Sequence, residues 1–415
     1  MKAKTDTRAH AGRETLSDVG LTRRKLLALT AMTGVGVGLR GQLVTPAIAQ
    51  AKPIKIGVLA PLSGVYSSLG TNEINGVKMF FDEQQSKVAG RAIDLVIEDE
   101  GLDPQTGLRK ARKLVEVDQV DMLLGVLNSS IGYAVKEYAI REKKVWVTFG
   151  AGADGIFKKK NNSPYAFRSD LSNWQCNQPM GAWIADKGYK RVFVCGPDYA
   201  MGHESINAAT AGLTLKGAEK VGEVFAPLGT TDYAPYLAQI KRTNPDLVYA
   251  AYAGSDAARF VQQYAKFGLR ASIPLAGYGY LVEEDVLPAE GDAALGINSG
   301  LNWAYGLDIP ANRRFVADYR KRYTASPTID SAAGYVSAQV VHEALKSLSG
   351  DIPNQLALSE AVAKVKIDTP RGPFSFDPET HNVIQNVYIR EVVKDGDELH
   401  NKVIVTHENV RDPGI

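Results

Sequence analysis

Short apolar runs alternate with longer amphipathic stretches along most of this chain of 415 residues. The apolar runs are rich in β-branched residues, as in IKIGVLA at residues 54–60, and the stretches between them have the length of helices. This alternation is typical of βαβ units, in which parallel strands form a sheet and the connecting helices cover its faces. The sequence therefore predicts an α/β fold.

The pattern divides into two sets with a break near residues 168–174. In the first set, strands are predicted at residues 54–60, 93–98, 121–125 and 145–149, and helices at 72–85, 105–117 and 131–142. In the second set, strands are predicted at 192–195, 222–225, 247–252 and 273–277, and helices at 203–216, 233–242 and 257–267. Two Rossmann-like lobes in tandem, each with a parallel sheet, account for both sets.

The remaining tail is too short for a third lobe. It has helical patterns at residues 311–323 and 330–348 and strand patterns at 387–393 and 402–405. We expect these pieces to be shared between the lobes, with the chain crossing near Asp170, Trp303 and Phe374. The predicted N-terminal lobe is 50–171 plus 303–373, and the predicted C-terminal lobe is 172–302 plus 374–415. Such a multi-strand hinge would let the lobes close on a ligand cleft.

The first 49 residues have the composition of an export signal. Arg23 and Arg24 precede an apolar stretch at residues 26–39, and Ala47 and Ala49 form a small-x-small cleavage site. The stretch is shorter than the ~20 residues of a membrane-spanning helix, although an uncleaved anchor is the alternative. Residues 1–49 are therefore predicted to be a cleaved signal peptide of the twin-arginine type, and the protein is expected in the periplasm.

Charge and residue usage exclude several classes of function. The formal net charge of +2 becomes −3 without residues 1–49, which carry +5, and a nucleic-acid partner would favour a basic surface. The six histidines are scattered, and the two cysteines, Cys176 and Cys195, leave a disulfide open. No phosphate-binding loop, nucleophile elbow or zinc motif occurs in the mature chain. We therefore expect no enzyme activity, no metal and no cofactor.

Residues suited to binding a ligand follow several predicted strands. Ser129 and Ser130 begin a helix after one strand, and Gly150 and Gly152 follow the next. In open parallel sheets, ligands bind beyond the carboxyl ends of the strands, where helix N-termini present free N–H groups. These residues predict a polar half-cleft that favours an anion. The alternatives are plain helix capping for the serines and a tight turn for the glycines.

The second lobe offers aromatic residues at the corresponding strand ends. Tyr199, Tyr252 and Tyr278 each follow or end a predicted strand. Each one alone could be a boundary residue with a buried ring and a hydrated hydroxyl group. Three in one lobe predict an aromatic half-cleft that faces the polar one.

Several motifs resemble the leucine/isoleucine/valine-binding branch of the periplasmic binding proteins. They are IGVLAPLSG at 56–64, Asp99 and Pro104 before a basic helix, LLG at 123–125, DYAMGH at 198–203 and PLGTTDY at 227–233. The resemblance covers nearly the whole mature chain. It implies a monomeric periplasmic receptor that binds a small solute between two lobes and delivers it to the permease of an ABC importer.

The resemblance also assigns roles to individual positions. The serine that binds a ligand carboxylate falls on Ser129, with Ser130 beside it, and a backbone contact falls on Gly150. Gly152 stands where amino-acid binders tend to have a threonine, and the tyrosine that closes over the ligand falls on Tyr252.

The acidic residue that pairs with a ligand ammonium falls on Tyr278. An ammonium buried without a partner is costly, so a small carboxylic acid, above all an aromatic acid stacked on Tyr199, Tyr252 and Tyr278, is the favoured ligand. Branched-chain or other amino acids, urea and short amides are the alternatives. An acidic residue entering the pocket would favour an amino acid, and the candidates are Glu283, Glu284, Asp256 and Asp330. A ligand sensor and a periplasmic hydrolase are the alternatives of other classes.

Overall fold

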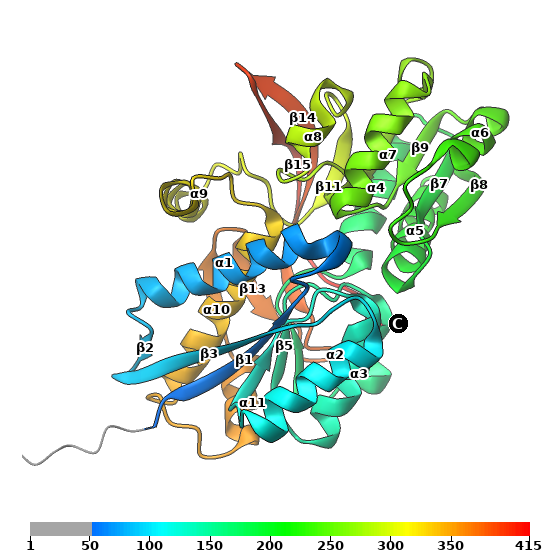
Figure 1. The fold of residues 1–415 in the computed structure, drawn as a ribbon. Coiled ribbons are helices and arrows are strands. Elements are labelled where there is room, and N and C mark those ends of the chain that lie inside the picture. Colours follow the sequence, from blue (N-terminus) through cyan, green and yellow to red (C-terminus); the bar gives the residue numbers. More distant parts are fainter. Residues whose placement is uncertain (1–51) are drawn as a thin grey trace, which may run out of the picture. The chain divides into compact units, whose positions relative to one another are not determined.

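The computed structural model describes residues 52–415, so the predicted signal peptide lies outside the described residues. Two sheets, mostly parallel, confirm the predicted α/β fold with two lobes (Figure 1). Among residues 52–415, no helix combines the length and the apolarity that a membrane span requires.

The first sheet has the strand order β2-β3-β1-β4-β5-β6. Its strands are β1 (Ile54–Ala60), β2 (Lys87–Val88), β3 (Arg91–Asp99), β4 (Met122–Leu124), β5 (Trp146–Thr148) and β6 (Ala166–Arg168). All pairs are parallel except the short hairpin of β2 and β3. The helices that follow these strands are α1 (Ser67–Glu83), α2 (Pro104–Arg112) and α3 (Ser129–Arg141), and a π-helical turn, Lys113–Val117, extends α2.

Alternation along β1 assigns the helices to the two faces of this sheet. Ile54, Ile56 and Val58 pack in the core cluster of α1, whereas Leu59 packs in the cluster of α2 and α3. Side chains alternate between the faces of a strand, and β1 is buried on both faces. This explains why the strand reads as an almost continuous apolar run.

The second sheet is larger and mixed. Its strand order is β12-β13-β14-β11-β10-β9-β7-β8, with β15 paired to β14. Its strands are β7 (Arg191–Pro197), β8 (Glu219–Ala226), β9 (Leu247–Ala250), β10 (Leu275–Tyr278), β11 (Asn298–Leu301), β12 (Lys366–Thr369), β13 (Gly372–Phe376), β14 (Val383–Asp395) and β15 (Glu398–Val410). The strands β7 to β11 pair in parallel, and β14 joins β11 in antiparallel orientation.

The later helices pack partly on this second sheet and partly on the first sheet. They are α4 (Asn173–Asp186), α5 (Ala200–Leu215), α6 (Ala234–Thr243), α7 (Gly254–Lys266), α8 (Leu287–Glu290), α9 (Pro310–Tyr323), α10 (Ile329–Ser347) and α11 (Gln355–Ala363). The helix α10 lies against α1 (Figure 1), where a Cβ at Gly76 would meet the Ser331 carbonyl oxygen. The tail therefore contributes elements to both lobes, since α10 packs on α1 and β14 joins the second sheet. The exact lobe boundaries stay a prediction.

The structure adds elements that the sequence pattern does not predict. The helix α4 contains Pro179 and many polar residues, and β6 and β11 are only three and four residues long. The tail strands are longer than predicted, and β14 and β15 form an antiparallel hairpin of 13 residues each. Short strands and polar helices give little periodicity, so tertiary packing defines them.

The two cysteines are buried and free, which resolves the open question of a disulfide. Cys176 on α4 belongs to one core cluster, and Cys195 on β7 belongs to another. Val194, beside Cys195, faces the cluster of Cys176. Because neighbouring residues of a strand point to opposite faces, Cys195 points away from α4.

Candidate functional site

A small cavity lies at the carboxyl ends of strands from both sheets. Its lining residues follow β1, β4 and β5 of the first sheet and β7, β9 and β10 of the second, together with the start of α4. They are Tyr66, Leu69, Leu127, Ser129, Gly150, Asn173, Tyr199, Met201, Ala253, Tyr278 and Tyr280. The volume is about 20 Å³, roughly the space of one water. Binding a solute therefore requires the two walls to separate.

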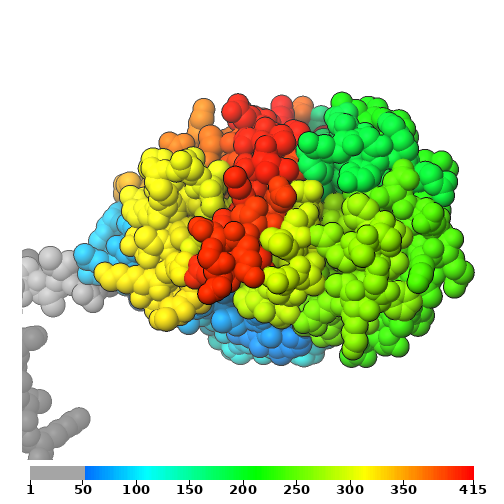
Figure 2. Space-filling model, turned by 90° about the horizontal axis from the view of Figure 1, so that it is seen from above, coloured from blue at the N-terminus to red at the C-terminus, as the bar shows by residue number. Residues whose placement is uncertain are grey.

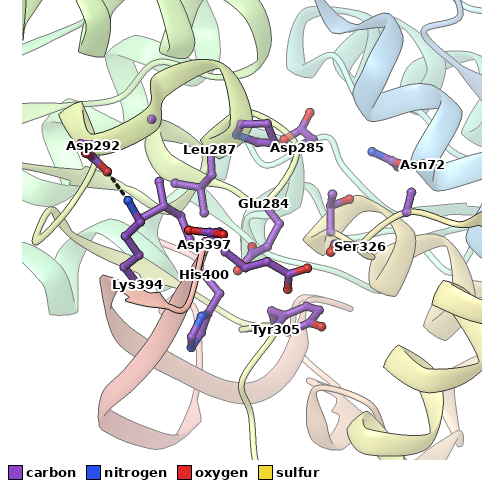
Figure 3. A pocket seen from close by; sticks show the side chains of 16 residues that line it. Asn72, Glu284, Asp285, Leu287, Asp292, Tyr305, Ser326, Lys394, Asp397 and His400 are labelled. Atoms are coloured by element: carbon purple, nitrogen blue, oxygen red, sulfur yellow. Dashed lines mark hydrogen bonds and ion pairs between the residues drawn. The ribbon is translucent and has the colours of Figure 1, made fainter.

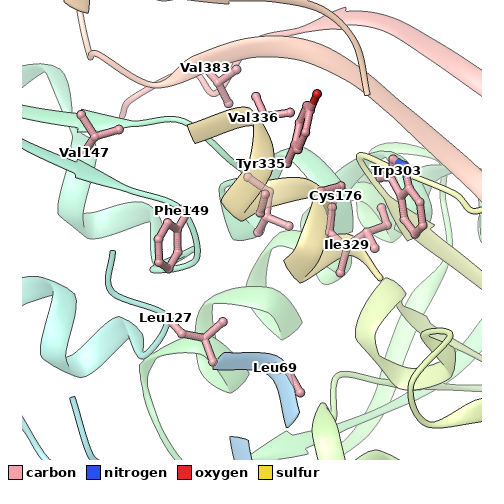
Figure 4. Packing of buried hydrophobic residues seen from close by; sticks show 14 of the residues in the cluster. Leu69, Leu127, Val147, Phe149, Cys176, Trp303, Ile329, Tyr335, Val336 and Val383 are labelled. Atoms are coloured by element: carbon pink, nitrogen blue, oxygen red, sulfur yellow. The ribbon is translucent and has the colours of Figure 1, made fainter. Parts of the chain in front are cut away.

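The cavity borders the main apolar core. Leu69 and Leu127 belong both to its lining and to the core cluster, in which Phe149 also packs (Figure 4). The ends of parallel strands are the usual position of ligand sites in such sheets. The cavity thus lies at the strand ends where the sequence analysis expects a ligand.

Ser129 is the first residue of α3 and lines the cavity with a buried side chain. Its hydroxyl oxygen accepts a hydrogen bond of 3.1 Å from Ala153 N. The hydroxyl proton is therefore available to donate to a ligand. Asn128 caps the helix, because its Oδ1 atom accepts from Ser130 N at 2.9 Å and from Ile131 N at 3.3 Å. Ser130 does not line the cavity, and it contributes its backbone N–H group to the cap formed by Asn128.

Glu100 fixes the loop that carries Leu127 and Asn128. Its carboxylate oxygens accept hydrogen bonds from Leu127 N at 3.1 Å and from Asn128 N at 2.8 Å. Burial raises the pKa of Glu100 to about 8, although these two hydrogen bonds lower it. The polar wall is thus held by a buried acid from the end of β3.

Gly150 lines the cavity at a point where no side chain fits. A Cβ atom there would lie 2.8 Å from Leu127 Cδ1 and 2.9 Å from Glu73 Oε1. The Glu73 carboxyl, which is fully buried, therefore packs against the wall of the cavity behind Gly150.

Asn173 is a lining residue that the sequence analysis missed. It begins α4 and is fully buried, and neither polar atom of its side chain has a hydrogen-bond partner among the described residues. A buried amide without partners is costly, and because this one lines the cavity, it is a candidate for binding a ligand. In the sequence, Asn173 lies in the break at residues 168–174 between the two predicted sets, and this position is the signal that could have pointed to it.

Gly152 contributes through Asn173 rather than directly. Its carbonyl oxygen accepts a hydrogen bond of 2.6 Å from Asn173 N. A Cβ atom at Gly152 would lie 2.7 Å from Asn173 Oδ1. Gly152 does not line the cavity, but its lack of a side chain makes room for the Asn173 amide.

Aromatic rings form most of the opposite wall. Tyr199 and Tyr278 line the cavity. The ring of Tyr278 meets that of Tyr280 edge to face, with centroids 5.2 Å apart. The hydroxyl oxygens of Tyr199 and Tyr66 are 2.7 Å apart, and this contact joins the two walls.

Tyr252 does not line this cavity, although the sequence analysis expects it to close over the ligand. Its ring packs on Phe260 and Tyr233, with centroids 4.6 and 5.3 Å away, inside the core of α6 and α7. The neighbouring residues Ala251 and Ala253 face the other cluster. The alternation of β9 continues past its end, so Ala253 reaches the cavity and Tyr252 turns away.

The four acidic candidates are held in different ways. Asp256 pairs with Arg259, and Glu283 accepts from Arg390 at 2.8 Å and from Ile329 N at 2.7 Å. Glu284 accepts from Asn401 N at 3.0 Å. Among these four acids, Asp330 is the one that forms a hydrogen bond with a lining residue, since its Oδ1 atom accepts from the Tyr280 hydroxyl at 3.1 Å.

A larger groove of about 560 Å³ opens elsewhere on the surface (Figure 3). It lies beside the tip of the β14–β15 hairpin, which Figure 2 shows between the segments around α8 and α9. Its walls include Glu284, Asp285 and Glu398, and Lys394 pairs there with Asp292 at 2.9 Å. None of the seven residues predicted to bind the ligand lines this groove, whereas four of them line the small cavity, which is therefore the candidate ligand site. No group of three or more possible metal ligands occurs within residues 52–415.

Known proteins are similar to this chain over most of its length. A family model described as periplasmic binding protein matches residues 53–397. A protein named Leu/Ile/Val-binding protein homolog 6, from Brucella melitensis, is 32% identical, over 88% of this chain and 95% of that protein.

Two solved structures are similar over most of their length. A solute-binding protein of Rhodopseudomonas palustris BisB5, in complex with 3,4-dihydroxybenzoic acid, is 31% identical with a TM-score of 0.83, covering 87% of this chain and 99% of that one. Another from R. palustris, in complex with 4-hydroxybenzoate, is 30% identical with a TM-score of 0.83, covering 88% and 99%.

Proposed function

The chain belongs to the periplasmic binding protein family, and from this premise we propose that it captures an aromatic or other small carboxylic acid for an ABC importer. Substrate-binding proteins of these transporters deliver small solutes to a membrane permease. The ligand would bind in the small cavity after the walls separate and would be enclosed when they close.

The lining of the cavity is the observation that carries this proposal. Four of its eleven residues are tyrosines, and none of the eleven carries a charge. A flat ring stacks well on such a wall. The Ser129 hydroxyl and the Asn173 amide offer uncharged donors to a carboxylate, and the positive end of the α3 dipole favours an anion. The two aromatic-acid complexes of similar proteins support the same ligand class.

An amino acid is the second candidate. The relatives are named as homologues of leucine/isoleucine/valine-binding proteins, and Asp330 contacts the lining residue Tyr280. An α-ammonium would need such a carboxylate as its partner. Tyr278, however, stands at the position where the resemblance expects that acid.

A ligand screen tests the proposal directly. The purified protein is heated with benzoate, 4-hydroxybenzoate, leucine, valine or urea, and bound ligand raises the melting temperature by mass action. We expect shifts with the two aromatic acids only. Titration calorimetry then gives the Kd, which the Asn173→Ala variant should raise about tenfold. Shifts with leucine and valine alone would instead establish the amino-acid candidate.

A further inference from the structure

Two buried acids, Glu73 and Asp330, each lie next to a residue that lines the cavity, and three of their four carboxyl oxygens have no hydrogen-bond partner among the described residues. We propose that Glu73 and Asp330 form a polar end of the ligand site, which selects aromatic acids that carry a ring hydroxyl over unsubstituted ones. This inference rests on the proposed function and narrows the proposed ligands to aromatic acids with a ring hydroxyl group. It assigns the two acids a different role from the carboxylate-binding wall of Ser129 and Asn173.

Glu73 lies on α1 and is fully buried. Neither of its carboxyl oxygens has a hydrogen-bond partner among the described residues. Its Oε1 atom packs against Gly150, which lines the cavity. A buried carboxyl group without a partner is costly unless some bound group satisfies it. Its position behind the cavity wall makes the ligand the candidate for that group.

Asp330 approaches the cavity from α10. It is 1% exposed, and one oxygen, Oδ1, accepts from the hydroxyl of the lining residue Tyr280. The other oxygen, Oδ2, has no partner within the described chain. The helices α1 and α10 are in direct contact, since a Cβ at Gly334 would lie 2.1 Å from the Glu73 carbonyl oxygen. The two acids therefore come from one helix pair beside the cavity.

The surrounding charges favour the neutral form of both groups. Burial raises the pKa of Glu73 well above its usual range, and the neighbouring Asp330, Glu100 and Asp170 raise it further. Burial also raises the pKa of Asp330, and Asp285, Glu283 and Asp170 add to this effect.

The nearby buried arginines are paired with other acids. Arg371 pairs with Asp170, and Arg390 pairs with Glu283 at 2.8 Å. A neutral carboxyl both donates and accepts hydrogen bonds. A phenolic hydroxyl group has the same double capacity, whereas an unsubstituted ring edge has neither. An ammonium would favour ionised partners instead. The chemistry of this pair thus matches a hydroxylated ring.

The test compares affinities for benzoate and 4-hydroxybenzoate by titration calorimetry. We expect the native protein to bind 4-hydroxybenzoate about tenfold more tightly. Glu73→Met, which removes the polar atoms at similar length, should abolish this preference and leave the Kd for benzoate within about twofold. Glu73→Gln should keep the preference, because a neutral amide also donates and accepts. If Glu73→Met does not fold, Asp330→Leu removes the other acid of the pair and should likewise abolish the preference for 4-hydroxybenzoate.

Glu290→Met is the matched control. Glu290 is 4% exposed, and both its oxygens lack partners within the described chain, but it does not line the small cavity. Glu290→Met should retain the native ratio of the affinities for 4-hydroxybenzoate and benzoate.

Three outcomes would overturn the inference. They are an unchanged ratio in Glu73→Met, a native preference for benzoate, and binding of leucine that Glu73→Gln abolishes. In the first two, aromatic acids still bind and the proposed function stands. Failure of the native protein to bind any aromatic acid would remove both proposals together.

Discussion

The hydroxyl groups of Tyr66 and Tyr199 form a hydrogen bond of 2.7 Å between the two walls of the cavity. Tyr66 follows β1 of the first sheet, and Tyr199 follows β7 of the second. The bond therefore exists only when the walls are together, and it should favour the closed form that encloses a ligand.

Removal of either hydroxyl should weaken ligand binding. We expect Tyr66→Phe and Tyr199→Phe each to raise the Kd about threefold to tenfold, since one neutral hydrogen bond contributes about 0.5–1.5 kcal/mol. The double variant should be little worse than either single variant, because both remove the same bond. Titration calorimetry measures this, and Tyr233→Phe is the control, since the Tyr233 hydroxyl has no partner among the described residues. Additive losses would show that the two hydroxyls act separately.

Tyr252 should matter for stability and not for binding. Its ring is fully buried against Phe260 and Tyr233. Tyr252→Ala should lower the free energy of unfolding by about 3–5 kcal/mol, as expected for loss of a large buried aromatic side chain. Tyr252→Phe should leave the Kd unchanged. Denaturant titration measures the free energy of unfolding, and titration calorimetry measures the Kd. A tenfold loss of affinity in Tyr252→Phe would show that Tyr252 contributes to the ligand site.

Ser129 and Ser130 form a matched pair for testing the carboxylate wall. Ser129→Ala removes a donor that lines the cavity and should raise the Kd for a carboxylate about tenfold or more, because hydrogen bonds to charged groups contribute about 1.5–3 kcal/mol. The neutral amide of the same acid should lose less. Ser130→Ala should change either Kd less than about twofold, since Ser130 does not line the cavity. Equal losses for the acid and the amide would contradict an anion-binding role for Ser129.

Glu100 should make the stability of the fold depend on pH. Burial raises its pKa from 4.5 to about 8 in the folded protein. Below about pH 4.5, both the folded and the unfolded chain carry this proton, so its contribution is fully present. Between about pH 4.5 and 8, the unfolded chain releases the proton and the folded chain keeps it, so stability falls by at most ~1.4 kcal/mol per pH unit.

Denaturant titrations from pH 5 to 8 check this slope. Glu100→Gln should make it shallower, since the variant does not titrate. Glu98→Gln is the control, because hydrogen bonds from Lys110 and Lys113 lower the pKa of Glu98. Its contribution is lost only as the pH falls through that lowered pKa, so its variant should keep the slope between pH 5 and 8. The same slope in Glu100→Gln as in the native protein would exclude Glu100 as its source.

Much of the fold was predictable because local periodicity sets which face of an element is buried. The strand β1 has the predicted bounds, 54–60, and α9 starts one residue before its predicted start. The helix α4 escaped prediction because Pro179 and its polar residues obscure a helical pattern. Its role is fixed by the elements packed around it, which lie far away in the sequence.

The sequence by itself determined the α/β class, the family and the strand ends at which a ligand would bind. It also placed Ser129, Gly150, Tyr199 and Tyr278 at those ends, and the structure brings these four together around the cavity. Tertiary structure alone decided that Tyr252 points into the core, that Asn173 lines the cavity and that Glu73 packs behind its wall at Gly150. The physical reason is that composition and periodicity act along the chain, whereas the direction of a side chain past a strand end depends on what packs against it.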